Sequence, residues 1–320
     1  MDFEYTVLEN GFDFILLSLN DLRIICDDNP DADERKRLLK YSLLNASSGV
    51  ELVLKYYLLK AHWVYIFADM DAARANSFQK GEFSSADLKT ILARLENLCD
   101  VSFTDEQKND FLRLKERRNK AEHFMLKDSF EAIQAIIHKS ISSLVQIIIQ
   151  YYDLDSFGEE ETTMFAEIKD VLRNLKQHYE DAKLIAQKQL ELSGMAKYVC
   201  ICPECGEQFL LRDDGVVCKF CGYEDDAESA AELYMENIMN MSAYSTIKNG
   251  GTMPIYDCPQ CGYETLVIDS DNNCAVCFSC DYSCEPSELI FCAKCDQPFE
   301  GDEETGCICS SCLEQLVEDD

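Results

Sequence analysis

The segment CPECGEQFLLRDDGVVCKFCGY, residues 202–223, contains two Cys-x2-Cys knuckles separated by twelve residues. Four thiolates at this spacing are typical of a structural zinc site, in which a tetrahedral sulfur shell holds one metal ion. A filled shell leaves no open coordination position for water, so this motif predicts metal-dependent folding rather than catalysis by the metal. Gly206 and Gly222 follow the knuckles, where a backbone that turns toward sulfur needs a residue tolerant of positive φ.

The same unit occurs again further along the chain. CPQCG at 258–262 repeats CPECG at 202–206, and CFSCDY at 277–282 repeats CKFCGY at 218–223. A third pair of knuckles, CAKC and CSSC, covers 292–295 and 309–312. The pattern predicts three zinc ribbons, each a small unit with short β hairpins that needs its metal to fold, and about three structural Zn²⁺ ions per chain.

The ribbon spacing selects twelve of the sixteen cysteines that lie after residue 195. The predicted ligands are Cys202, Cys205, Cys218, Cys221, Cys258, Cys261, Cys277, Cys280, Cys292, Cys295, Cys309 and Cys312. In the second ribbon, alignment with the first selects Cys277 and Cys280 from several nearby candidates. Cys200, Cys274, Cys284 and Cys307 remain without a role. Sixteen thiols are also enough for a fourth site, but three ribbons need fewer assumptions. Iron or redox chemistry at the knuckles is the alternative to structural zinc.

Charge and composition separate this cysteine-rich tail from the rest of the chain. The 320 residues have a net charge of −31, and the part after residue 195 has five basic and twenty-six acidic residues. This excess repels phosphate at long range and excludes a generic electrostatic DNA binder. We therefore expect the acidic tail to recognise a protein partner or trigger rather than to bind RNA directly.

The N-terminal sequence and the apolar runs predict a soluble chain. The start, MDFEYTVLENGFDF, lacks the basic-then-apolar pattern of a signal peptide, and no run approaches about 20 uninterrupted apolar residues. We expect a cytoplasmic protein with no membrane partner. In a chain without an export signal, paired cysteines favour metal binding over disulfides.

The first 195 residues are predicted to be almost wholly helical, because apolar residues recur at 3.6-residue spacing. The expected helices cover roughly 33–70, 84–98, 104–125, 128–153 and 160–193, after an apolar series at 12–22. The predicted fold class is mainly α, a helical bundle followed by a small zinc-ribbon tail. The expected domains are a bundle at 1–157, a linking helix at 158–195, ribbons at 196–226, 255–288 and 289–320, and a short helix with linker at 227–254.

Arg118 is an anomaly in the helix predicted at 104–125. The apolar stripe of this helix is expected to contain Phe111, Leu114, Arg118, Ala121 and Met125. A charge at an interior position is costly unless it has a function. His123 lies five residues further on, about 140° around the helix, so one regular helix does not stack the two side chains.

The hexapeptide RNKAEH at 118–123 resembles the Arg-x4-6-His motif of the HEPN superfamily, and GVELVLKYYLLK at 49–60 is similar to the second helix of many HEPN proteins. The resemblance covers roughly residues 10–153. It implies a homodimer, formed through the helical domain, in which two motifs meet in one cleft and cleave RNA without a metal ion. The products it implies are a 2′,3′-cyclic phosphate and a 5′-OH.

The resemblance also implies roles for individual residues. His123 is the expected general base or acid, and Arg118 is expected to hold the phosphate and neutralise its developing charge. Asn119 matches the polar position of the motif, and Glu51 on the second helix is the expected partner that orients Arg118. If the site is shared between subunits, Arg118 and His123 need not lie on the same face of one helix, and their separation of about 140° is no obstacle. The function that follows is a metal-independent endoribonuclease of the toxin or phage-defence kind.

Other interpretations of the same residues remain open. Arg118 and Glu122, at i and i+4, form an ordinary surface salt bridge if the helix register shifts by one position. An inactive HEPN adaptor that binds RNA or protein, or an unrelated bundle, is a separate alternative. A transcription-linked factor that uses the ribbons on polymerase or nucleic acid is a further alternative. Five other side chains are expected to be structural: Cys26, Cys99, His62, His138 and His178.

Overall fold

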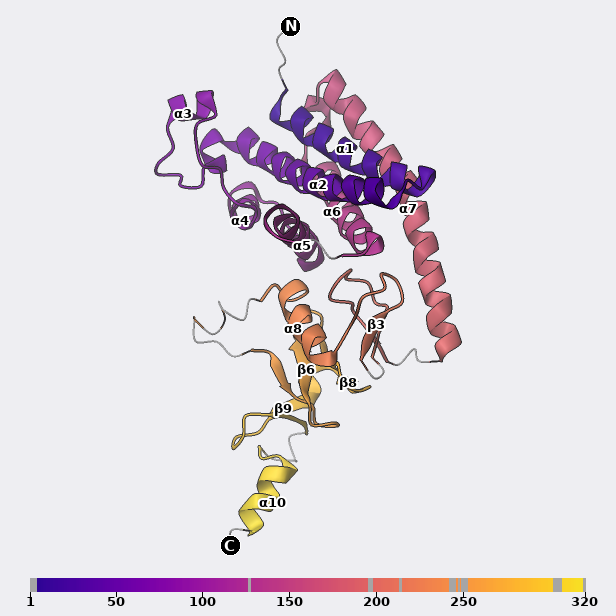
Figure 1. Cartoon of the computed structure of the whole chain (residues 1–320). Helices are drawn as coiled ribbons and strands as arrows, with labels where there is room; N and C mark the ends of the chain where they lie inside the picture. Colours follow the sequence, from indigo (N-terminus) through magenta and orange to yellow (C-terminus); the bar gives the residue numbers. More distant parts are fainter. Residues whose placement is uncertain are drawn as a thin grey trace. The chain divides into compact units, whose positions relative to one another are not determined.

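The computed structural model of the chain contains two compact units, residues 1–181 and residues 182–320 (Figure 1). The residues that the structure describes are 5–125, 128–194, 198–212, 215–241, 246, 248, 253–301 and 307–318. The predicted fold class is confirmed, because the first unit is helical and the second combines short antiparallel strands with clustered cysteines.

Helices of very different length build the first unit. The α-helices are α1 Val7–Asp28, α2 Ala32–Ala61, α3 Ala75–Lys80, α4 Leu88–Cys99, α5 Asp105–His123, α6 Phe130–Tyr151 and α7 Glu159–Ser193, with 3-10 turns η1 Trp63–Ile66 and η2 Leu154–Ser156. Thr104 forms a capping box with Gln107 at the start of α5.

Glycine permits the close approach of α1 and α2, which lie side by side in Figure 1. A Cβ atom on Gly49 would lie 2.6 Å from Ile15 Cγ1 and 2.8 Å from the carbonyl oxygen of Gly11. A larger residue at this position therefore forces the two helices apart. Further along the same contact, the fully buried hydroxyl of Ser42 donates to the Ser18 carbonyl at 2.9 Å, which satisfies a polar group inside the core.

Helix α6 is the central apolar element of the helical unit. In the described part of the chain it is the one helix long and apolar enough to cross a membrane, and 72% of its most apolar window is buried. Ile133, Ile137, Ile141 and Leu144 are each fully buried in the main core, as the periodicity predicts. Burial of this kind is typical of the core helix of a bundle.

The helix expected to link the two parts contributes to the bundle. Phe165, Ile168, Val171 and Leu175, in the N-terminal half of α7, belong to the main core of the first unit. The boundary between the units falls inside α7, between Asp181 and Ala182.

Two helix boundaries differ from the sequence prediction. The helix expected at 33–70 ends at Ala61, where His62 adopts an extended conformation and its Nδ1 accepts from the amide of Val64. The helix expected from Ser84 or Ser85 begins instead at Leu88, with Asp87 as its cap. Asp87 caps α4 by accepting from the amide of Thr90, and the His62 side chain caps the 3-10 turn that follows α2.

The described residues of the second unit form three small antiparallel sheets. Two have four strands and the orders β1-β2-β3-β4 and β5-β6-β7-β8, and one pairs β9 with β10. The elements are β1 Val199–Cys200, β2 Leu210–Arg212, β3 Val216–Cys218, β4 Glu224–Asp225, α8 Ala227–Asn237, β5 Ile255–Asp257, β6 Glu264–Asp269, β7 Cys274–Cys277, β8 Ser283–Cys284, η4 Pro286–Glu288, β9 Leu289–Phe291, β10 Pro298–Glu300 and α10 Ser310–Glu318. Most of the expected linker before β5 lies outside the described residues.

A buried carboxylate lies between α5 and α6. Ser143 donates to Asp110 Oδ2 at 2.8 Å, and Ser140 donates to the Asp110 carbonyl at 2.9 Å. Burial nevertheless raises the pKa of the Asp110 carboxyl to about 6, although the Ser143 hydrogen bond opposes this shift. A raised acid pKa means that Asp110 disfavours the folded state once pH rises through about 6.

We predict that Asp110→Asn stabilises the helical unit at pH 7 by up to about 3 kcal/mol and that this gain disappears near pH 3, where the aspartate is protonated in both the folded and the unfolded state. Urea unfolding of both proteins at the two pH values measures the difference. Equal effects at both pH values would show that Asp110 does not carry this pH dependence.

Candidate functional site

The twelve predicted cysteines form three clusters with the geometry of structural zinc sites. Within each cluster the four Sγ atoms lie within 4.8 Å of one another, and the clusters are Cys202, Cys205, Cys218 and Cys221; Cys258, Cys261, Cys277 and Cys280; and Cys292, Cys295, Cys309 and Cys312. The shortest Sγ–Sγ separations, such as Cys205 to Cys218, are 3.7 to 3.8 Å. A tetrahedral shell with Zn–S bonds of about 2.3 Å requires about 3.8 Å. In the described part of the chain, these donor sets fit about three structural zinc ions.

Backbone amides support the sulfur shells. The amide of Glu204 lies 3.4 Å from Cys202 Sγ, and the amide of Ser279 lies 3.4 Å from Cys277 Sγ. Such bonds stabilise thiolate charge. Gly206 and Gly222 adopt φ values of 72° and 73°, as predicted for residues that follow a knuckle. In the third ribbon Asp296 occupies the same kind of position with φ 59°.

The remaining tail cysteines lie outside the three shells. Burial raises the pKa of Cys200 to about 12, which keeps its sulfur in the thiol form. Burial also raises the pKa of Cys274 and of Cys284, whose sulfur accepts a hydrogen bond from the Tyr282 hydroxyl at 3.4 Å. Cys307 is exposed. The ribbon spacing predicted no role for these thiols, and Cys200, Cys274 and Cys284 are buried or half-buried outside the metal-binding clusters.

A buried arginine joins the first ribbon to the second. Arg212, on β2, is 2% exposed, and its Nη1 donates to the carbonyls of Cys277 at 2.7 Å and Tyr282 at 3.0 Å. These carbonyls belong to a zinc knuckle of the second ribbon. The Arg212 guanidinium of the first ribbon therefore offsets the partial negative charge of carbonyl oxygens in the second. Sequence reasoning missed this contact, since Arg212 has no periodic or motif signal.

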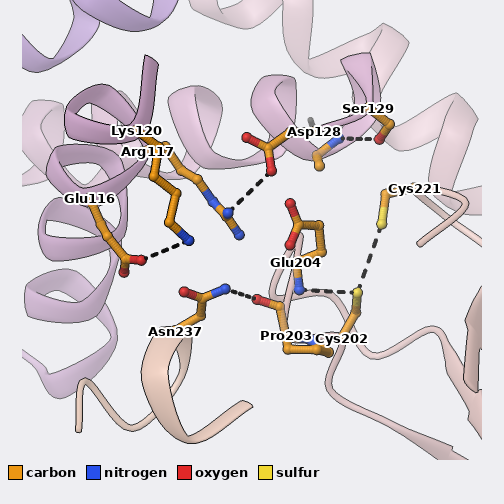
Figure 2. Close-up of polar contacts among 11 residues, drawn as sticks. Glu116, Arg117, Lys120, Asp128, Ser129, Cys202, Pro203, Glu204, Cys221 and Asn237 are labelled. Atoms are coloured by element: carbon orange, nitrogen blue, oxygen red, sulfur yellow. Dashed lines mark hydrogen bonds and ion pairs between the residues drawn. The ribbon is translucent and has the colours of Figure 1, made fainter. Parts of the chain in front are cut away.

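Helix α8 connects the same two ribbons. Asp226 caps it by accepting from the amide of Ser229 at 2.9 Å. The Tyr234 hydroxyl donates to Asp269 in the second ribbon at 3.0 Å. Asn237 donates to the Pro203 carbonyl in the first ribbon at 3.1 Å, a contact drawn in Figure 2. The 227–237 segment is therefore a structural brace as well as a connection.

The register of α5 differs by one position from the sequence expectation. The buried stripe runs through Phe111, Leu114, Arg117 and Ala121, and Arg118 is 34% exposed. Arg117 forms a buried ion pair with Asp128 at 3.1 Å (Figure 2). The expected interior position of Arg118 is wrong, because a three-residue step after Leu114 satisfies the helical period as well as a four-residue step.

The end of α5 gathers the residues of the predicted catalytic motif. Arg118 Nη1 lies 2.7 Å from Glu122 Oε2 and 3.1 Å from Asn119 Oδ1, and His123 Nε2 lies 3.5 Å from the same Glu122 oxygen. Because Arg118 Nη1 and His123 Nε2 both lie close to Glu122 Oε2, the two nitrogens are at most about 6.2 Å apart. One chain therefore brings the arginine and the histidine together, despite their separation of about 140° around the helix. The His123 side chain is 71% exposed.

Two further expectations concern the partners of these residues. Glu51 forms an ion pair with Lys55, which also donates to Ser85 at 2.9 Å, so among the described residues Glu122 rather than Glu51 is the acidic partner of Arg118. The i,i+4 spacing of Arg118 and Glu122 was the signal for this pairing.

The other histidines have structural partners, in agreement with the sequence. His138 stacks on Tyr179 with ring centroids 4.8 Å apart, and His178 lies 3.3 Å from the carboxylate of Asp27. In the described part of the chain, no histidine belongs to a metal-binding cluster.

Comparisons with known proteins find limited similarity. No protein-family model and no solved structure matches the chain. Transcription factor S4 of Saccharolobus solfataricus is 28% identical over 87 residues, which cover 25% of this chain and 92% of that protein. Transcription factor S of Archaeoglobus fulgidus is 33% identical over 67 residues, which cover 20% of this chain and 65% of that protein.

We predict three zinc ions per chain by elemental analysis of protein purified without chelator, and two in Cys205→Ser, whose first ribbon loses its folding free energy while the helical unit stays folded. Cys284→Ser, a tail cysteine outside the shells, is the control and should keep three. A wild-type content of one zinc ion or none would contradict the assignment.

Proposed function

We propose that the chain is a metal-independent endoribonuclease of the HEPN kind, which acts as a homodimer. Its proposed catalytic site consists of Arg118, Asn119 and His123. The observation that supports it is the cluster at the end of α5, in which an arginine and an exposed imidazole contact one anionic oxygen. Phe124 and Met125, next to the motif, are 84% and 51% exposed and offer apolar area for a second subunit.

The position of the Glu122 carboxylate suggests how a phosphate binds. Its Oε2 atom lies 2.7 Å from Arg118 Nη1 and 3.5 Å from His123 Nε2, so a non-bridging phosphate oxygen that takes its place lies near the same two groups. Arg118 then neutralises charge on the phosphorane. The proposed substrate must displace Glu122, because a carboxylate and a phosphate compete for the Arg118 guanidinium.

The proposed reaction needs no group other than these side chains. His123 accepts the proton of the ribose 2′-OH, whose oxygen forms a bond to phosphorus. The bond between phosphorus and the 5′ oxygen breaks, and His123 of the partner subunit donates a proton to the departing oxygen. The products are a 2′,3′-cyclic phosphate and a 5′-OH. The zinc ions take no part, since their shells contain four sulfurs and no open position.

The ribbons have a separate proposed role. With five basic and twenty-six acidic residues after residue 195, the tail is suited to a basic protein surface rather than to an RNA backbone. In a toxin or phage-defence system such a surface belongs to a partner or trigger that controls cleavage.

A second candidate function is favoured by the comparisons. Two archaeal proteins named as transcription factors match up to a quarter of the chain, so a non-catalytic, transcription-linked binding module is the alternative. In that case the chain should co-purify with RNA polymerase subunits and leave RNA intact.

We predict that Arg118→Ala and His123→Ala each lower RNA cleavage by about 10² to 10⁴-fold, the range for loss of an acid–base or charge-stabilising group. Arg173→Ala and His178→Ala, which also remove exposed ion-paired residues, serve as matched controls and should retain activity. Cleavage should survive a brief EDTA treatment, and the products should lack a 3′-OH that can be ligated. Rescue by magnesium after EDTA inactivation, or full activity in both alanine variants, would refute the site.

We predict that Glu122→Gln tightens RNA binding and raises kcat/KM several-fold, because it removes the negative charge with which the phosphate competes. Filter binding and single-turnover cleavage at low substrate concentration measure the two effects. If Glu122→Gln instead inactivates the protein, Glu122 orients Arg118 and His123 during the reaction and is not a competitor.

A further inference from the structure

A pocket of about 300 Å³ opens where α2, α4 and α6 end, within the helical unit. This volume is at the lower limit of small-molecule pockets, which span roughly 300 to 1,000 Å³. It does not belong to the proposed catalytic cluster. That cluster lies at the end of α5 from which the chain enters α6, and the 22 residues of α6 separate the two sites by about 33 Å of helix.

Three tyrosines form a fixed aromatic wall in this pocket. The hydroxyl of buried Tyr152 donates to the Val53 carbonyl at 2.7 Å, which holds the ring in place. The Tyr57 ring lies 4.8 Å from Tyr152 at 37°, and the Tyr56 ring lies 6.2 Å from it at 27°. Partly exposed rings that are already ordered offer a stacking surface at little entropic cost.

The polar groups at the mouth are mainly hydrogen-bond donors. In the described part of the chain, the hydroxyls of Tyr56 and Tyr57 make no hydrogen bond and the ammonium of Lys60 has no carboxylate partner. Burial raises the pKa of both tyrosines, so their hydroxyls remain protonated donors. The Lys60 ammonium lies 5.9 Å from the Tyr56 ring centroid. Asp153, at the rim, supplies one carboxylate acceptor.

We propose that this pocket binds a nucleotide, with its base against the tyrosine rings and its phosphate at Lys60. An organic cation is disfavoured, because Lys60 already lies over the Tyr56 ring and repels a second positive charge. A purely apolar ligand would leave the donors of Tyr56, Tyr57 and Lys60 without acceptors. A base can also donate an amino or imino hydrogen to Asp153.

The proposal is independent of the ribonuclease proposal. The ligand is either a free nucleotide or a nucleotide within an RNA strand, which share the same ring and phosphate. Variants at Arg118 and His123 leave the pocket intact, so its binding can be measured in a cleavage-deficient background.

Isothermal titration of the full, zinc-loaded Arg118→Ala chain with AMP, UMP and a short oligouridylate tests the site. We expect micromolar binding, and about a tenfold rise in Kd in Lys60→Ala and in Tyr57→Leu, from loss of a charged hydrogen bond and of stacking. Lys40→Ala is the matched control, since Lys40 lies 6.0 Å from the Tyr41 ring on the same helix but outside the pocket. Tyr57→Phe keeps the ring if Tyr57→Leu unfolds the bundle, and should lose only the hydroxyl contact.

The two sources give different results. Mononucleotide binding assigns the site to a free nucleotide, and Lys60-dependent binding of the oligonucleotide alone assigns it to a strand. The proposal is overturned if neither probe binds, if Lys60→Ala and Lys40→Ala have equal effects, or if tetramethylammonium binds in place of the nucleotides.

Discussion

Tetrahedral coordination by four thiolates is the constraint on which the second unit depends. The core of its second ribbon contains few apolar side chains beyond Leu266, Ala275 and Leu289, too little area to offset the entropy of ordering the chain. Zinc supplies the missing free energy, and the sulfur separations of about 3.8 Å then fix how the knuckles face one another. That geometry sets the register of the strands and turns the carbonyls of each knuckle outward. It therefore also sets where α8 and Arg212 pack.

The helical unit is organised by a different force, the burial of apolar stripes around α6. Its polar interior groups are therefore informative. Ser18 with Ser42, and Asp110 with Ser143, are satisfied by short hydrogen bonds, whereas the motif at Arg118 and His123 lies on the surface. A charge pair at a helix end costs little stability, so its presence is compatible with either catalysis or a simple surface contact, and kinetics rather than stability separates the two.

Local patterns in the sequence predicted the zinc ligands and most helices, since Cys-x2-Cys spacing and the 3.6-residue period are properties of neighbouring residues. The same period did not fix the register of α5, because Arg117 and Arg118 both fit a helical stripe and only packing against the rest of the unit decides between them. The contacts of Arg212 join residues in different ribbons that lie far apart in the sequence. No single-sequence pattern records such pairs.

The Arg212 contact also gives the two repeated ribbons different identities. In the repeat, Arg212 of the first copy corresponds to Ile268 of the second, so only one copy carries the buried guanidinium and only the other provides its carbonyls. The two ribbons therefore cannot exchange places along the chain. A chain truncated between them would lose the Cys277 and Tyr282 carbonyls that accept from Arg212, so the two ribbons are coupled through this one side chain.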